Sequence, residues 1–101
     1  MAKKSMIARE VKRRKLNEQH RTTRESLRQR VVDESLSYDE RWQAMLDLQK
    51  LPRDSARTHQ RNRCALTGRP RGYFRRFGLA RNALREVVMR GEAPGVVKAS
   101  W

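Results

Sequence analysis

Ten arginines are concentrated between residues 53 and 85, and their side chains offer the clearest binding chemistry in this sequence. The stretch holds one acidic residue, Asp54, and no lysine. Arginine presents a planar fork of N–H donors that pairs with phosphate through two hydrogen bonds and stacks on nucleobases. Tyr73, Phe74 and Phe77 are interleaved with these arginines, and this mixture neutralises phosphates and stacks unpaired bases. The segment therefore predicts nucleic-acid binding, although Phe77 is favoured for a small core and Tyr73 fits either role.

Catalytic and metal-binding chemistry is poorly supported. Cys64 with His20 or His59 supplies a nucleophile and a base, but no third group orients them. A structural zinc site needs four Cys or His ligands, usually in two close pairs, and only His59 and Cys64 are near each other in sequence. Gly-x-Gly phosphate loops and paired carboxylates are also missing from the pattern. We therefore expect no enzyme, no metal and no cofactor, with Cys64 as a small buried or half-buried thiol.

Helices are predicted for the first half of the chain. Residues 3–18 contain good helix formers without Gly or Pro, and the capping box Thr22-Thr-Arg-Glu25 predicts a second helix over 22–33. Another capping box, Ser37-Tyr-Asp-Glu40, starts a helix that Leu51-Pro52 ends. Tyr38, Trp42, Met45 and Leu46 form one apolar face of this helix. Tyr38 and Trp42 are assigned to helix packing.

The second half is predicted to be less regular. Residues 53–63 show no apolar periodicity and read as an extended linker. Residues 64–74 suggest two short strands around a turn at 68–72. Leu79 to Val88 mark a closing helix that Gly91 ends. The fold class is thus mostly α with a short β-hairpin, in an extended non-globular chain. It divides into a helical region at 1–50, an arginine-rich linker at 51–63 and a hairpin-helix module with its tail at 64–101.

Composition explains why such a chain would depend on a partner. Among 101 residues, 25 Lys and Arg stand against 11 Asp and Glu, a net charge of +14, and only 37% are hydrophobic. This rules out a well-filled enzyme core, and a polyanionic partner would supply what the core lacks. Residues 33–50 are instead acidic, with five acids and two bases. We expect them to face away from the polyanion or toward a basic protein. The single cysteine suits a reducing cytoplasm, and neither a membrane span nor a secretion signal is predicted.

Several ordered stretches together resemble one family, the bacterial small-subunit ribosomal protein fourteen. The match is dense over 51–101 and looser over 1–50, where the opening Met1-Ala-Lys-Lys-Ser5 is similar. The matching stretches are Leu51-Pro-Arg-Asp-Ser55, Arg61-Asn-Arg-Cys64, Thr67-Gly-Arg-Pro-Arg-Gly72, Phe77-Gly-Leu79, Leu84-Arg-Glu86, Met89-Arg-Gly91, Pro94-Gly95 and Lys98-Ala-Ser-Trp101.

One departure from the family's pattern concerns its zinc ligands. Zinc-binding members carry two Cys-x-x-Cys pairs, which fall here on Cys64, Thr67, Ala80 and Ala83, so three of the four ligands are lost. The resemblance therefore implies the long, zinc-free branch, with a zinc-ribbon-like hairpin and helix lacking the metal. We expect Leu66, Phe77, Leu79 and Leu84 to fill the place of the metal.

The resemblance also implies a function and partners. It implies a structural protein in the head of the small ribosomal subunit, bound to 16S ribosomal RNA in the cytoplasm. Its expected neighbours are the small-subunit proteins three, ten and nineteen, with no membrane, small-molecule substrate or homo-oligomer. The RNA contacts carried over are Arg53, Arg57, Arg61, Asn62, Arg63, Arg69, Arg71, Arg75, Arg76, Arg81 and Arg85, with Tyr73 as a stacking candidate; further contacts are expected at Lys3, Lys4, Arg9, Lys12, Arg13, Lys98, Ser100 and Trp101.

Two other classes use the same basic residues. A nucleoid or DNA-architectural protein is the alternative, but the acidic segment 33–50 and the lack of a recognition helix or minor-groove wedge count against it. A membrane-surface protein needs an apolar helix face opposite Lys and Arg, and here the best apolar face lies on the acidic helix.

Overall fold

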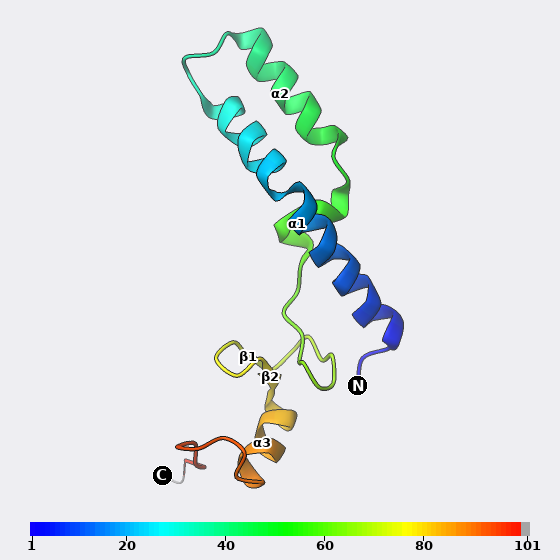
Figure 1. The fold of residues 1–101 in the computed structure, drawn as a ribbon, viewed down its shortest axis with the longest axis vertical. Coiled ribbons are helices and arrows are strands. Elements are labelled where there is room, and N and C mark those ends of the chain that lie inside the picture. Colours follow the sequence, from blue (N-terminus) through cyan, green and yellow to red (C-terminus); the bar gives the residue numbers. More distant parts are fainter. Residues whose placement is uncertain (100–101) are drawn as a thin grey trace. The chain divides into compact units, whose positions relative to one another are not determined.

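The structure, a computed structural model, describes residues 1–99 as three α-helices, two 3-10 turns and one hairpin (Figure 1). This confirms the prediction of a mostly α chain with a short β-hairpin. The elements are α1 (Lys4–Val32), α2 (Tyr38–Lys50), η1 (Arg53–Ser55), η2 (Arg57–His59), β1 (Tyr73–Phe74), β2 (Leu79–Ala80) and α3 (Arg81–Met89). Contacts divide the chain into two units, 8–60 and 1–7 with 61–101. The functional division at residues 50 and 63 stays a prediction.

Helix α1 is one uninterrupted element, so the predicted break before Thr22 is wrong. The capping box at 22–25 would need Thr22 to leave helical geometry, but no Gly or Pro lies between residues 1 and 51 to stop the preceding helix. A capping sequence starts a helix only where the chain already enters from outside one. Thr22 and Glu25 are therefore exposed positions inside α1.

Helix α2 has the predicted ends. The Ser37 hydroxyl accepts from the Glu40 backbone N–H at 3.4 Å, and Asp39 and Glu40 occupy the first turn, where carboxylates favour the positive end of the helix. Leu51 takes an extended conformation before Pro52, which ends α2.

The side chains that pack α2 differ from the prediction. Within unit 8–60, α2 lies beside the second half of α1 (Figure 1), and the Arg41 Nε donates to the Val31 carbonyl at 3.0 Å. Ala44 is the buried residue of α2. Tyr38 and Trp42 are 76% and 49% exposed and stack on each other with ring centroids 6.5 Å apart. Their assignment to helix packing is wrong because they pair along the surface of α2.

The predicted extended linker is partly folded. Within residues 53–59 the chain forms η1 and η2, and Ser55, the last residue of η1, is fully buried. The Asn17 side-chain amide donates to the Ser55 carbonyl at 2.9 Å, and Arg24 Nε donates to the Ser55 hydroxyl at 2.8 Å. Polar side chains of α1 hold this segment in place. Hydrogen bonds of this kind require no apolar periodicity, so the sequence pattern did not indicate that the segment is folded.

The hairpin lies further along the chain than predicted. Tyr73 pairs with Ala80 and Phe74 with Leu79, so the turn falls at residues 75–78 and not at 68–72. Gly78, with φ +68°, supplies the left-handed backbone that closes this turn. Residues 68–72 form the loop that precedes β1. Gly68 and Gly72 also have positive φ. The loop therefore needs glycines for its backbone conformation, and those glycines make its sequence resemble that of a hairpin turn.

The core of the second unit is smaller than predicted. Cys64, Ala80 and Ala83 form its buried cluster, with Leu79 packed against it. Leu66 and Phe77 are 62% and 37% exposed, so they do not fill the place of the metal. The small side chains of this cluster let the loop at Cys64 approach α3 directly. The larger side chains of Leu66 and Phe77 lie at the surface.

Helix α3 ends as predicted. The Gly91 N–H donates to the Val88 carbonyl and the Glu92 N–H to the Val87 carbonyl, with Gly91 at φ +76°. This pair of bonds is a Schellman motif.

Candidate nucleic-acid interface

The arginines of the hairpin region point mainly to the surface. Arg75 and Arg76 are exposed in the β1–β2 turn, and Arg81 and Arg85 are exposed on α3. The Arg81 backbone N–H donates to the Gly72 carbonyl at 2.8 Å, and a Cβ on Gly72 would lie 3.4 Å from the Arg81 side chain. The hairpin and the first turn of α3 thus present their guanidinium groups from one compact unit.

Two arginines of the same unit are half-buried and serve the fold. Arg63 Nη1 donates to the Gly68 carbonyl at 2.9 Å, which braces the loop before β1. Arg69 contributes its backbone, because its carbonyl accepts from the Cys64 N–H at 3.0 Å. The predicted contacts at Arg61, Asn62 and Arg71 are exposed, and Tyr73 is half-buried on β1.

The N-terminal segment is part of this unit. The Ala2 N–H donates to the Thr67 carbonyl at 3.2 Å, and Ile7 lies so close to Gly68 that a Cβ there would be 2.8 Å away. Lys3 and Lys4 are exposed beside this contact. Lys98 is exposed in the tail, and the candidates Ser100 and Trp101 lie outside the described residues.

In unit 8–60 one of the predicted contacts, Arg13, is half-buried and the other four are exposed. Arg13 Nε lies 3.4 Å from the Asp54 carboxylate, and Arg13 Nη1 donates to the His59 carbonyl at 3.5 Å. Asp54, the one acid of the arginine-rich stretch, is therefore engaged by α1. Arg9, Lys12, Arg53 and Arg57 are exposed.

A pocket lined by α1, η2 and Gln60 contains arginines that the sequence analysis missed. Its volume is about 380 Å³, and its lining is Asn17, Arg21, Arg24, Glu25, Arg28, Arg57 and Gln60. Residues 17, 21, 24 and 28 follow helical spacing along one face of α1. That signal was in the sequence, but the predicted break at residue 22 divided the face between two helices.

A second hollow lies on α3. Its lining combines apolar side chains, among them Phe74, Leu84 and Val88, with the cationic Arg81, Arg85 and Lys98. Phe74 is 48% exposed, so an aromatic surface is accessible next to cationic side chains. An aromatic side chain beside cations is the combination that stacks unpaired bases and contacts their phosphates.

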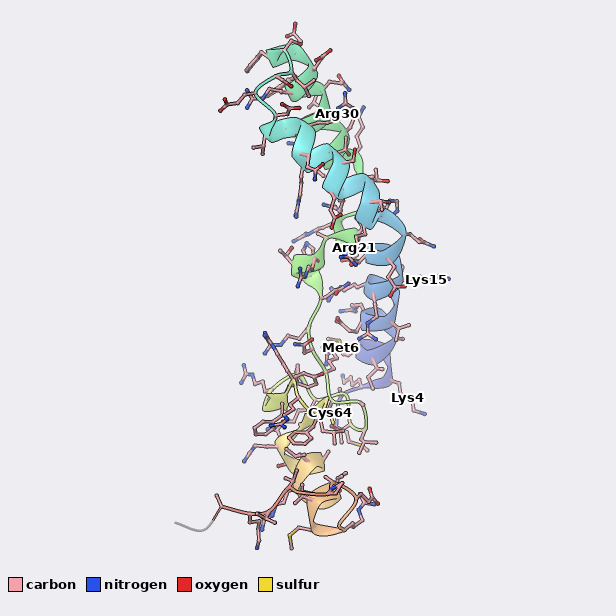
Figure 2. All side chains as sticks on the ribbon, turned by 60° about the vertical axis from the view of Figure 1, so that its left-hand side comes forward. Lys4, Met6, Lys15, Arg21, Arg30 and Cys64 are labelled. Atoms are coloured by element: carbon pink, nitrogen blue, oxygen red, sulfur yellow. The ribbon has the colours of Figure 1, made fainter. Side chains whose placement is uncertain are left out.

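Three of the four positions that carry zinc ligands in the related family lie close together in this chain. The side chains present at these positions do not fit a metal ion. Cys64, Ala80 and Ala83 share the buried cluster, labelled at Cys64 in Figure 2, and alanine has no ligand atom. Among residues 1–99, no group of three His, Cys, Asp or Glu side chains could hold a metal ion.

The Cys64 thiol has an unusual environment. Burial raises its pKa, but hydrogen bonds from the Ala80, Thr67 and Leu66 backbone and from the Thr67 hydroxyl outweigh burial and lower the pKa to about 7. The loop therefore directs donors toward Cys64, and their net effect is to stabilise the thiolate.

A comparison with known protein families identifies the family that this chain matches. The family model described as Ribosomal protein S14p/S29e matches residues 47–100, more than half of the chain. The match covers the 53–85 arginines, the hairpin and α3. In the described part of the chain, no helix is long and apolar enough to cross a membrane.

Proposed function

The chain belongs to the ribosomal protein S14p/S29e family, a family of structural proteins of the small ribosomal subunit, and on that premise we propose that it binds 16S ribosomal RNA in the head of that subunit. Its role there is to position RNA segments and neutralise their phosphates, and the chain performs no catalysis.

The observation that carries this proposal is the exposure of the 53–85 arginines. Eight of the ten are exposed, and the single acid of the segment is already paired with Arg13. So many like charges within 33 residues repel one another, and phosphates relieve that repulsion. Folded RNA is recognised through shape and backbone contacts, which suits arginines spread over loop, hairpin and helix.

The size of the core supports the same conclusion. The buried apolar residues among those described are Ala44, Cys64, Ala80 and Ala83, while Leu66, Phe74 and Phe77 remain at the surface. A chain with so little buried apolar area gains order from its partner. We propose that RNA covers these surface side chains in the ribosome.

The helical region carries the proposed protein contacts. Helix α2 and its preceding turn are acidic, and Tyr38 and Trp42 form an exposed stacked pair there. Such a surface suits a basic protein neighbour and repels phosphate. We assign it to contacts with small-subunit proteins three, ten and nineteen, within a cytoplasmic small subunit.

The test is salt-dependent binding of the full chain to deproteinised small-subunit ribosomal RNA. Replacing Arg75 and Arg76 by Gln should lower the slope of log affinity against log salt by about 1.4–1.8, since each lost phosphate contact removes about 0.7–0.9. The Lys15→Ala, Arg30→Ala variant is the control, because both residues are exposed outside the proposed interface. Equal affinity for duplex DNA of the same length would instead support a DNA-architectural protein. Failure of the endogenous protein to sediment with small subunits would overturn the proposal.

A further inference from the structure

The pocket lined by α1, η2 and Gln60 combines several arginines with neutral hydrogen-bond donors. Four arginines line it, Arg21, Arg24 and Arg28 from α1 and Arg57 from η2, against one carboxylate, Glu25. The Asn17 and Gln60 amides add neutral N–H donors. The lining thus carries a net charge of three positive units and is rich in donors.

The pocket is also built before any ligand arrives. Arg24 Nε donates to the Ser55 hydroxyl at 2.8 Å, and Arg24 Nη2 donates to the Pro52 carbonyl at 3.1 Å. The Asn17 amide donates to the Ser55 carbonyl at 2.9 Å. These bonds fix the segment that carries Arg57 and Gln60 against α1, so the donors are held in place and less order is lost on binding.

The remaining arginines are available to a ligand. Arg28 and Arg57 are exposed, and Arg21 makes a solvent-exposed ion pair with Glu25 at 3.5 Å. An exposed ion pair of this kind is worth at most about 1 kcal/mol, so a stronger anion displaces it readily. Arg21 and Arg28 are separated by a rise of about 10 Å along the helix. A row of that length suits a strand with successive phosphates better than a single carboxylate.

We propose that this pocket, formed by Arg21, Arg24, Arg28 and Arg57, binds the phosphodiester backbone of an RNA strand. It is a second RNA-binding site, on the helical region, separate from the arginines of 61–85. The inference rests on the proposed function, because it assigns RNA as the ligand of both sites. Guanidinium forks from α1 and η2 would contact the phosphates from two sides.

The test compares two double variants of the full chain. Arg21→Gln with Arg28→Gln removes two pocket arginines and leaves Arg24, which holds the fold through Pro52 and Ser55. Lys15→Ala with Arg30→Ala removes the same charge from the same helix. Arg30 follows Arg21 by about two and a half turns, which places it on the opposite side of α1; Lys15, Arg21 and Arg30 are labelled in Figure 2. Circular dichroism of the wild-type chain and the two double variants checks that α1 is intact.

The measured quantity is the salt dependence of binding to deproteinised small-subunit ribosomal RNA. The pocket variant should lower the slope by about 1.4–1.8 and weaken binding at least tenfold at low salt, and the control should change the slope by less than about 0.5. Equal slopes for the two variants would overturn the pocket as an RNA site. If the wild-type chain itself does not bind RNA, the proposed function is wrong, and the pocket proposal that rests on it is wrong as well.

One further outcome identifies a different ligand. If the pocket variant binds RNA like the control but is excluded from small subunits, the pocket receives an acidic protein segment, and the RNA assignment is wrong. Reconstitution of small subunits with each variant, followed by sedimentation, distinguishes this case. The expected result is reduced RNA binding and reduced incorporation together.

Discussion

The two units of this chain use different means to hold themselves together. Unit 8–60 pairs two helices and ties the segment after Pro52 to α1 through side-chain hydrogen bonds centred on Ser55. The unit of residues 61–99 with the N-terminal segment encloses three small side chains and shows most of its arginines to solvent. The first depends on polar contacts with defined partners, and the second depends on close approach of backbone segments around a minimal core.

This contrast separates charges that fold the protein from charges that are free to bind. Arg13, Arg24 and Arg63 bind carbonyl, hydroxyl or carboxylate oxygens within their own units. Arg75, Arg76, Arg81 and Arg85 are exposed. Counting basic residues in the sequence cannot make this division, because both groups are arginines in arginine-rich stretches.

The largest effect is expected at Ser55. Replacing Ser55 by Ala removes the hydroxyl that Arg24 binds, and a hydrogen bond to a charged group contributes about 1.5–3 kcal/mol. We expect about 2 kcal/mol less protection against hydrogen exchange in 8–60 and no change in 61–99. Ser26→Ala, at an exposed position of α1, is the control. Equal loss of protection in both units would show that they do not fold separately.

A smaller effect is expected from paired glycine variants in the other unit. Gly68 and Gly91 have φ of +74° and +76°, so alanine costs about 1–2 kcal/mol at either position. A Cβ at Gly68 would also meet Ile7 at 2.8 Å, whereas nothing lies within 4 Å of one at Gly91. Thermal unfolding should therefore show Gly68→Ala to be the more destabilising variant. The reverse order would argue that residues 1–7 do not pack on this loop.

A third effect is a pH dependence confined to the unit that contains Cys64. The pKa of Cys64 is lowered in the fold from an ordinary 9.0 to about 7, so its thiolate stabilises the folded state fully above pH 9, and this contribution is lost as the pH falls through 7. Protection of 61–99 should rise between pH 7 and 9 by at most about 2 kcal/mol, after correction for intrinsic exchange. Cys64→Ala should remove this rise. A rise that persists in Cys64→Ala would come from another group.

Sequence patterns predicted the elements whose causes are local. The Ser37 cap, the stop at Leu51-Pro52 and the glycine after α3 each depend on a few neighbouring residues, and each is present. The hairpin was misplaced because Gly68 and Gly72 carry the backbone signal of a turn without forming the strand pair. The folding of 53–59 was missed because its stabilising partners, Asn17 and Arg24, are more than 30 residues away. Distant polar contacts of this kind leave no periodicity to detect.

The same reasons explain what was missed in the candidate site. Arg53, Arg57 and the hairpin arginines were predicted as contacts from the arginine-rich composition of residues 53–85 and from the family resemblance. The pocket arginines Arg21 and Arg28 were not, because their grouping depends on α1 being continuous through Thr22. Whether a capping box starts a helix depends on the geometry of the preceding chain, and that geometry is not encoded in the four residues of the box.

The hydrogen bonds at Ser55 join residues that are synthesised at different times. The acceptors of Asn17 and Arg24 follow them by 38 and 31 residues, and the His59 carbonyl follows Arg13 by 46. A ribosome adds residues from the N-terminus, so α1 is made in full before any of these partners exists. Until residues 52–55 have emerged, Arg13 and Arg24 lack the partners that later engage them, and the bond from Arg13 to His59 forms last. The newborn helix therefore presents more unpaired positive charge than the finished protein does.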